Sequence, residues 1–240
     1  MKVRSIYSPN FNKKRRSYKS IKFLIIHYTG MQSERESIIR LCNSKSKVSS
    51  HFVINQKGKI YRLVQDNQIA WHAGKSCWGK YKNLNKTSIG IELVNKGHKF
   101  GYTNFKKKQL SSLIKICKNL IRKYRIKKQN IVGHSDVAPL RKIDPGEKFP
   151  WKELAYEKIG IWHNCNTKIL KKLRKVRIYP KFESEFINSL KKIGYCFDNK
   201  KKANFVKVIK AFQRHYRKEL INGIIDRECL LIAKNILKKI

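Results

Sequence analysis

Short apolar runs and amphipathic stretches alternate over the first two thirds of the chain. The run IKFLIIHY at residues 21–28 is rich in β-branched residues and too short for a helix, so it predicts a buried strand with His27 near its end. Ser33 is followed three residues later by Glu36, a pattern typical of a helix N-terminus. Apolar residues at helical spacing over 106–124 predict a second, longer helix.

Further strands are predicted between and after these helices. The segment SSHFVINQKGKIYRLV at 49–64 predicts two strands joined by a turn at Gly58. The run SIGIELV at 88–94 is apolar at alternate positions, which places Glu92 on the face opposite the isoleucines. NIVGH at 130–134 predicts another strand. The alternation of strands and helices favours an α/β domain around one sheet.

The pattern changes after Gly160. Residues 163–178 are polar and basic and predict a linker, and the segments beyond it (FESEFINSLKKIGY, ANFVKVIKAFQRHY and GIIDRECLLIAKNIL) have helical spacing only. A chain of 240 residues suits one medium domain and one small one. We therefore expect a basic N-terminal arm at 1–20, an α/β domain at 21–162, and a three-helix domain at 179–240.

Lysine dominates the charge of the chain. The sequence has 57 basic and 15 acidic residues, a formal net charge of +42, and 43 of the basic residues are lysines. Such a charge is typical of nucleic-acid binding through counterion release. However, the lysines are spread over nearly every segment, and few arginines are present to form the forks that read bases. Isoleucine and asparagine are also abundant, so a compositional bias explains much of the charge, and we expect no specific nucleic-acid partner.

The sequence contains neither a membrane span nor a visible export signal. No stretch approaches the ~18 uncharged apolar residues that a span needs, and the basic N-terminus lacks the apolar region of a signal peptide. A soluble, cytoplasmic protein is expected, with a periplasmic or cell-envelope location by another route as the alternative. Six cysteines are spread singly without a CxxC pair, which favours reduced thiols over a zinc knuckle or a redox dithiol.

The segment VGHSDVAPLRKIDPG at 132–146 concentrates polar side chains without a helix or strand period. It carries His134 and Asp144, while His27 ends the first predicted strand. Zinc binds histidine nitrogen and carboxylate oxygen, and three protein ligands leave a fourth position open for water. Each residue alone has an ordinary alternative: His27 is also consistent with a hydrogen-bonded structural histidine, and Asp144 with a turn residue before Pro145.

Five blocks of the sequence together resemble the zinc-dependent N-acetylmuramoyl-L-alanine amidases of the AmpD/AmiD type, relatives of phage amidases and peptidoglycan recognition proteins. The blocks are IIHYTG, VSSHFVI, IAWHAG, TSIGIELVN and GHSDVAPLRKIDPG, in the family's order and approximate spacing over residues 21 to about 160. The resemblance implies a mixed central β-sheet flanked by helices. It also implies hydrolysis of the amide between N-acetylmuramic acid, or its 1,6-anhydro form, and L-alanine in peptidoglycan or muropeptides.

The resemblance assigns roles to five residues. One zinc ion per chain would be held by His27, His134 and Asp144. Glu92 would be the catalytic carboxylate, and Lys142 would be the catalytic cation that stabilises negative charge. Without the resemblance, Glu92 would be interpreted as a strand carboxylate paired with one of the many lysines.

The resemblance also places residues along a substrate groove. Trp71, His72 and Ala73 would line it, with Trp71 stacking on apolar faces of the substrate and His72 donating to a carbonyl. A rim of packed aromatic residues is the alternative. Asn95 would bind polar groups of the stem peptide. His51 also matches the family, but strand alternation predicts a buried, hydrogen-bonded histidine outside the metal site.

The segments VIKAFQRHYR and NGIID resemble the small helical peptidoglycan-binding domain that is often appended to such amidases, although any three-helix bundle is an alternative. The implied partners are peptidoglycan or anhydro-muropeptides, bound by a monomer. Three classes of function are considered: a zinc amidase, a metal-free peptidoglycan receptor on the same fold, and a basic nucleic-acid binder. A receptor is expected to have lost a metal ligand or the catalytic carboxylate. All of these positions are retained, which favours the amidase.

Overall fold

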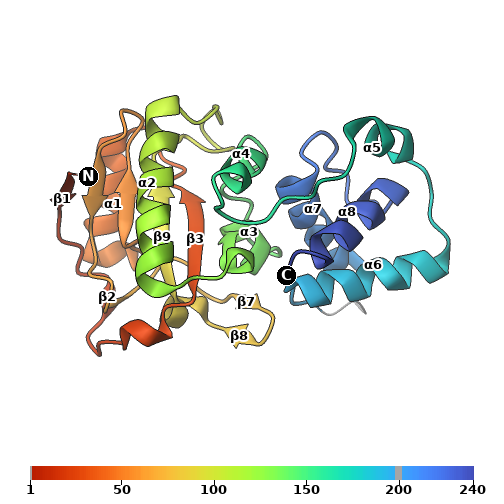
Figure 1. Ribbon diagram of the computed structural model, residues 1–240. Coiled ribbons are helices and arrows are strands. Elements are labelled where there is room, and N and C mark those ends of the chain that lie inside the picture. Colours follow the sequence, from red (N-terminus) through yellow and green to blue (C-terminus); the bar gives the residue numbers. More distant parts are fainter. Residues whose placement is uncertain (1, 198–201) are drawn as a thin grey trace.

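The computed structural model of the protein describes residues 2–197 and 202–240 and contains two units that lie side by side (Figure 1). A mixed sheet of six strands forms the centre of the first unit. Across the sheet these strands are β1 (Val3–Ser5), β5 (Ile60–Arg62), β4 (Phe52–Ile54), β9 (Ser88–Leu93), β3 (Phe23–Tyr28) and β10 (Ile131–Gly133). Only β4 and β5 pair antiparallel within this sheet. The expected mixed α/β fold is confirmed.

The two faces of the sheet have different surroundings. Helix α2 (Lys107–Tyr124) packs on one face, where Ile26 of β3 and Ile91 of β9 are fully buried. Because side chains alternate along a strand, His27 and Glu92 project from the opposite face. The sheet therefore turns one face to an apolar core and presents polar groups on the other.

The first helix and the hairpin follow the sequence pattern closely. Helix α1 (Glu34–Cys42) begins after Ser33, whose hydroxyl oxygen accepts from the backbone N–H of Glu36 at 3.1 Å. β4 and β5 are joined at Gly58, which adopts a φ of 83°. These predictions are confirmed.

The first twenty residues do not form a free arm as expected. β1 pairs parallel with β5 at the sheet edge, and β2 (Phe11–Asn12) pairs antiparallel with β6 (Ile69–Ala70). The side chain of Arg16 is buried, and its guanidinium donates to the Ser88 carbonyl at 2.7 Å. Strands of two or three residues are too short to give a sequence pattern, and this basic segment was therefore misjudged.

The second unit is helical, as predicted. Its three expected helices are α6 (Pro180–Ile193), α7 (Lys202–Tyr216) and α8 (Arg227–Leu237). A further helix, α5 (Thr167–Leu173), forms inside the segment 163–178 that was expected to be a linker. Leu170 of α5 is buried against the other helices, so this segment belongs to the helical unit.

A disulfide between Cys77 and Cys196 joins the two units. Cys77 lies in a small hairpin formed by β7 (Cys77–Trp78) and β8 (Tyr81–Lys82), and Cys196 follows α6. The expectation of reduced thiols throughout is therefore wrong for this pair. The two cysteines are 119 residues apart, so no local spacing reveals the pairing.

A buried polar cluster also connects the units. Asp136 lies in the short helix α3 (His134–Val137), and its carboxylate accepts from the backbone N–H of Gly133 at 2.7 Å and from the Tyr195 hydroxyl at 2.8 Å. The same carboxylate lies 2.7 Å from Nδ1 of His215 on α7. The helical unit thus contacts the helix that starts at His134, as the adjacent α3 and α7 in Figure 1 show.

None of the helices within the described ranges is both long enough and apolar enough to cross a lipid bilayer.

Candidate metal centre and active-site cleft

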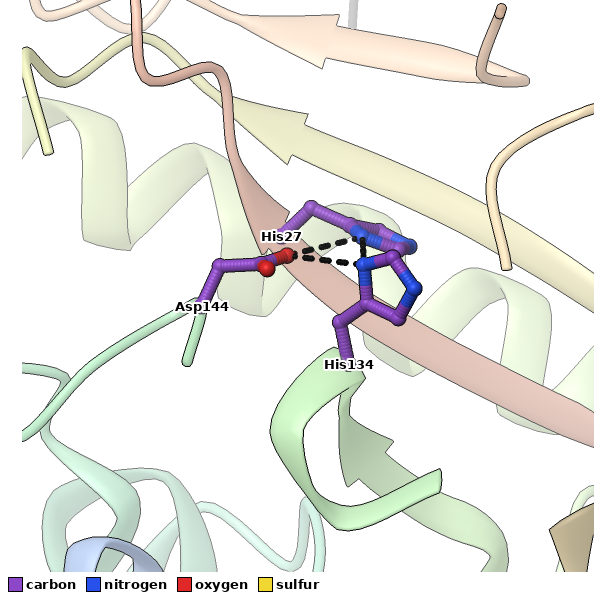
Figure 2. A group of neighbouring side chains, drawn as sticks. All are labelled: His27, His134 and Asp144. Carbon is purple, nitrogen blue, oxygen red and sulfur yellow. Dashed lines mark hydrogen bonds and ion pairs between the residues drawn. The ribbon is translucent and has the colours of Figure 1, made fainter. Parts of the chain in front are cut away.

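Three side chains that are far apart in the sequence converge at one end of the sheet (Figure 2). His27 lies near the carboxyl end of β3, His134 is the first residue after β10, and Asp144 follows in the next loop. β3 and β10 are parallel neighbours in register, with Ile26 opposite Gly133, so the residues that follow them lie together. The Nδ1 atoms of the two histidines are 3.0 Å apart, and Oδ2 of Asp144 lies 3.0 Å from His27 Nδ1 and 3.1 Å from His134 Nδ1.

The hydrogen bonds behind His27 determine which of its nitrogens carries a proton. The Ser88 hydroxyl donates to the Leu84 carbonyl at 2.6 Å, so Ser88 Oγ accepts from Nε2 of His72 at 3.1 Å. Burial lowers the pKa of His72 well below its ordinary value, so the ring is neutral and its Nδ1 is an acceptor. That acceptor lies 3.0 Å from His27 Nε2. His27 therefore donates through Nε2 and has a lone pair on Nδ1.

His134 is held in the same way. Its Nε2 lies 3.2 Å from the carbonyl oxygen of Ala73, to which it donates, and this leaves the lone pair on Nδ1. Two imidazole lone pairs and the Asp144 carboxylate thus face one another without a proton between them. A tetrahedral zinc site with bonds of ~2.1 Å has ligand–ligand separations of roughly 3.4 Å, close to those found here. The donor set and its outer hydrogen bonds fit a zinc ion.

The protonation states suit a bound cation. Burial, together with the neighbouring His134, lowers the pKa of His27 to about 4. Burial by itself raises the pKa of Asp144, but the adjacent His134 and His27 outweigh this and bring it well below its usual range. At neutral pH, His27 is uncharged and Asp144 is ionised, as metal ligands must be.

Glu92 and Lys142 line the same cavity as the three candidate ligands. Glu92 is directly opposite His27 in the β3–β9 pairing, so both side chains project from one face. Its Oε2 atom is buried and has no hydrogen-bond partner within the described residues. Burial raises the pKa of Glu92 to about 8; Asp144 adds to this shift, and Lys142 opposes it. The cavity therefore contains a carboxyl group that can exchange a proton near neutral pH.

The cleft around these groups has a volume of about 490 Å³. Trp71 forms part of its wall, as expected, and is held there because its indole N–H donates to Asn12 Oδ1 at 2.6 Å. Three cationic side chains also line the cleft: Arg40, Lys99 and Arg141. A groove of this size and charge suits an acidic ligand.

Three residues expected to bind substrate already make hydrogen bonds to other residues of the protein. His72 lines the cleft, but both of its ring nitrogens are used by His27 and Ser88. Ala73 is fully buried, and its carbonyl oxygen accepts a hydrogen bond from Nε2 of His134. Asn95 is buried, and its side-chain amide donates to the Thr103 carbonyl at 2.9 Å. Hydrogen-bond partners cannot be read from the sequence, and the substrate-binding roles of these three residues stay predictions.

His51 is a buried structural histidine, as predicted. It is fully buried, and its Nδ1 accepts from the backbone N–H of Gly90 at 3.1 Å. Gly90 itself is needed because a Cβ there would lie 2.4 Å from the ring of His72. The glycine thus leaves space for the ring that supports His27.

The sequence interpretation missed Arg141. Its guanidinium donates to the carbonyls of Ala73 and Lys75 and fixes the loop that supports His134. Arg141 lies next to Lys142 in the segment 132–146, and this position in the sequence could have indicated that it belongs to the site.

An α/β domain with an open cleft, a His-His-Asp cluster and a free carboxyl group is typical of hydrolases, and the cluster could hold a metal ion. Comparison with known families gives the particular family. The model described as N-acetylmuramoyl-L-alanine amidase matches residues 17–147, more than half of the chain. The chain belongs to this family and is an N-acetylmuramoyl-L-alanine amidase.

Its relatives include proteins of both one and two units. The chain is 36% identical over 236 residues to the N-acetylmuramoyl-L-alanine amidase AmiD of Escherichia coli K12, which covers 93% of this chain and 84% of that protein. It is 33% identical over 167 residues to the 1,6-anhydro-N-acetylmuramyl-L-alanine amidase AmpD of Haemophilus influenzae, with 62% and 88% covered. The similarity to AmiD therefore extends through the helical unit.

Solved structures also match over nearly the whole chain. The structure of Escherichia coli AmiD with anhydro-N-acetylmuramic acid-L-Ala-D-γ-Glu-L-Lys matches with a TM-score of 0.82 and 35% identity, covering 95% of this chain and 93% of that one. AmpDh3 of Pseudomonas aeruginosa, in complex with an anhydromuramic pentapeptide, matches with a TM-score of 0.81 and 31% identity, covering 95% and 96%. Both units of this chain thus share their fold with these amidases.

Proposed function

We propose that this amidase is a zinc enzyme that releases the stem peptide from N-acetylmuramic acid or its 1,6-anhydro form, in muropeptides and in peptidoglycan. One ion per chain would be held by His27, His134 and Asp144. The observation that carries the proposal is the convergence of three unprotonated donor atoms within 3.1 Å of one another. The substrate class is supported by the ligands of the AmiD and AmpDh3 complexes.

The chain's own residues divide the chemistry between them. A zinc ion bound here supplies a Lewis acid and lowers the pKa of a bound water toward ~7. Glu92 accepts the proton of the attacking water and returns it to the leaving amine of L-alanine. A carboxylate with a raised pKa is a stronger base than an exposed one, which suits this role. Lys142 stabilises the negative charge that develops on the former carbonyl oxygen, an effect typically worth ~3 kcal/mol.

The walls of the cleft suit the rest of the substrate. A muropeptide has apolar sugar faces and several carboxylates. Trp71 offers an aromatic surface to the former, while Arg40, Lys99 and Arg141 offer positive charge to the latter. We assign substrate positioning to these four side chains rather than to Ala73 and Asn95.

The disulfide is relevant to the cellular compartment in which the protein works. Disulfides persist in oxidising compartments and are reduced in the cytosol, so the Cys77–Cys196 pair supports a periplasmic or cell-envelope location over the cytoplasmic one. The cleft and all its candidate catalytic groups come from one chain, so a monomer, as expected from the resemblance, would be sufficient for the reaction.

The test is product analysis. Zinc-loaded protein is incubated with an anhydro-muropeptide, and the products are separated and identified by mass spectrometry. We expect the free stem peptide and anhydro-N-acetylmuramic acid, and no such products with Glu92→Gln. Binding of the intact muropeptide without cleavage, by zinc-loaded wild-type protein, contradicts the proposal and identifies a receptor instead.

A further inference from the structure

A second cavity, of about 260 Å³, lies between segment 139–143 and helix α7. Segment 139–143 forms one wall, and Lys207, Lys210 and Arg214 form the other. We call this cavity the interdomain groove. Arg141, Lys142 and Ile143 also line the active-site cleft, so the two cavities meet at this segment.

The interdomain groove is strongly cationic. Among the described residues its lining includes five basic side chains and no acidic one: Arg141, Lys142, Lys207, Lys210 and Arg214. Glu147 Oε2 lies 3.9 Å from Arg214 Nε, but this carboxylate also contacts His98 at 3.0 Å. Asp144 is close enough to act on Arg141. Arg214 Nε is buried and makes no hydrogen bond within the described part of the chain. The charge of the groove is therefore largely unbalanced by the protein itself.

The cations of α7 form a row. Lys207, Lys210 and Arg214 follow the spacing i, i+3, i+7, so they lie on one face of the helix and span roughly 10 Å along its axis. Like charges at this spacing repel one another. Lys207 Nζ donates to the Leu140 carbonyl at 3.3 Å, and a bound anion would relieve the remaining repulsion.

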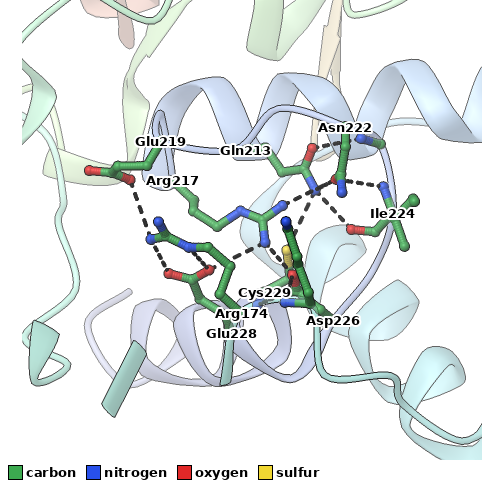
Figure 3. Close-up of polar contacts among 11 residues, drawn as sticks. Arg174, Gln213, Arg217, Glu219, Asn222, Ile224, Asp226, Glu228 and Cys229 are labelled. Atoms are coloured by element: carbon green, nitrogen blue, oxygen red, sulfur yellow. Dashed lines mark hydrogen bonds and ion pairs between the residues drawn. The ribbon is translucent and has the colours of Figure 1, made fainter. Parts of the chain in front are cut away.

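Helix α7 is held firmly in place behind this row (Figure 3). Arg217 at its end is fully buried and donates to Asp226 and Glu228. Arg174 forms two bonds of 2.7 Å with the same Glu228. On the other side, His215 contacts Asp136 of α3. The groove is consequently a preformed surface between two rigid supports.

We propose that the interdomain groove binds the carboxylates of a second stem peptide, one that is not being cleaved, in cross-linked or polymeric peptidoglycan. The stem that is cleaved has its own cations in the active-site cleft, where Arg40 and Lys99 lie. The row extends over about 10 Å, or about three residues of an extended peptide at ~3.3 Å per residue, so it can contact more than one carboxylate of a stem. This inference rests on the proposed function, because only such substrates carry a second stem near the first.

The lining of the groove favours a peptide over a nucleic acid. Leu140 and Ile143 are 45% and 40% exposed and give the groove an apolar edge. Its lining contains no aromatic side chain on which a base could stack. Occupation by a second stem would retain the enzyme on a multivalent substrate and raise the effective concentration of the scissile bond.

The experiment compares two substrates and two charge variants of the full chain. Lys207→Gln/Lys210→Gln removes two charges from the groove, and Lys171→Gln/Lys172→Gln removes two exposed charges from α5 as a matched control. Each protein is assayed on a monomeric anhydro-muropeptide with one stem and on a cross-linked dimer with two, at about 0.3 M salt to screen diffuse attraction. The measured quantity is kcat/KM for the dimer divided by kcat/KM for the monomer.

We expect this ratio to fall on the order of tenfold in the groove variant, as for the loss of charge-assisted hydrogen bonds, and to stay at the wild-type value in the control. Thermal unfolding of each variant checks that the fold is intact. A ratio unchanged in the groove variant, or lowered equally in the control, overturns the proposal. Amidation of the second stem's carboxylates should reproduce the effect with wild-type protein.

A binding measurement separates failure of this inference from failure of the proposed function. Calorimetric titration of Glu92→Gln protein with the dimer and the monomer needs no turnover. Tighter binding of the dimer, lost in the Lys207→Gln/Lys210→Gln background, supports the groove even if the wild-type enzyme cleaves neither substrate. Equal affinity for dimer and monomer overturns the proposal. Displacement of the bound dimer by a hexanucleotide as readily as by a second stem peptide also overturns it.

Discussion

His27 and Glu92 are register partners on the parallel strands β3 and β9, and both project from the face of the sheet opposite α2. This pairing fixes a candidate metal ligand and a candidate proton acceptor side by side on the two longest strands of the sheet. Neither position depends on a loop conformation. The remaining two ligands come from the segment after β10, which is tied to the same strands by the parallel β3–β10 pairing.

Replacing Glu92 should separate metal binding from catalysis. Glu92→Gln keeps the size of the side chain but cannot accept a proton, so we expect kcat to fall by roughly 10²–10⁴-fold with zinc content unchanged. Turnover and bound zinc are measured on the same preparation. Glu36→Gln, at an exposed position on α1, is the control and should match the wild type. Near-normal turnover in Glu92→Gln would show that another group is the base.

Removing one ligand should empty the metal centre. We expect about one zinc per wild-type chain by elemental analysis, and loss of both zinc and activity in His134→Ala, because two donors bind zinc poorly. His163→Ala, outside the cleft, is the control. A chelator should abolish wild-type activity, and added zinc should restore it. Full activity of metal-free protein contradicts the assignment.

Glu92 should also make the stability of the metal-free protein depend on pH. Its pKa is raised from 4.5 to about 8 by burial, so the folded state holds this proton more tightly than the unfolded chain. The stability that this bound proton contributes is fully present below the pKa of Glu92 in the unfolded chain, and it is lost as the pH rises toward 8. We expect chelator-treated Glu92→Gln to exceed wild type in unfolding free energy by roughly 3 kcal/mol at pH 7, with the difference vanishing near pH 4.

Urea unfolding of the two metal-free proteins across this range measures that difference. His27 has the opposite sign, because its lowered pKa removes stability as the pH falls from 6.5 toward 4. It is present in both proteins and cancels in the comparison. A stability difference that is independent of pH would mean that Glu92 is not protonated in the folded chain.

The disulfide should stabilise the folded chain. Cys77 and Cys196 close a loop of more than a hundred residues, so we expect Cys77→Ser/Cys196→Ser to lose about 2–4 kcal/mol of unfolding free energy. Cys42→Ser, at a free cysteine, is the control. Denaturant unfolding with and without reductant measures the effect. If reductant leaves the wild-type midpoint unchanged, the two thiols are not paired in solution.

Asp136 should be critical for stability, although it takes no part in the chemistry. Its carboxylate is buried among Gly133, Tyr195 and His215, and removing it leaves their polar groups without partners. We expect Asp136→Ala to cost about 3–5 kcal/mol, as for breaking a buried ion pair. Glu183→Ala, an exposed carboxylate of α6, should have little effect. Thermal and urea unfolding provide the comparison.

The sequence predicts those parts of the fold whose signal is local. The apolar run ending at His27, the cap at Ser33 and the turn at Gly58 each depend on a few adjacent residues, and each is found where expected. The gathering of His27, His134 and Asp144 was inferred only through resemblance to a family. Spacing along the chain does not reveal that β3 and β10 are neighbours.

The failures involve contacts between distant segments. Arg16 looks like part of a charged tail, yet it is buried beneath β9 through its bond to Ser88. Cys77 and Cys196 carry no spacing signal at all. In each case the deciding partner lies elsewhere in the chain, and only the folded structure identifies it.

The contact of α3 with the helical unit limits how this protein can be recombined. The helix that begins with His134 receives a hydroxyl and an imidazole from Tyr195 and His215, which belong to the other unit. A chimera that exchanges the last seventy or so residues for another helical unit would have to supply both groups at the same places. The second unit therefore supports the helix that carries His134, and exchanging it is expected to disturb the position of that residue.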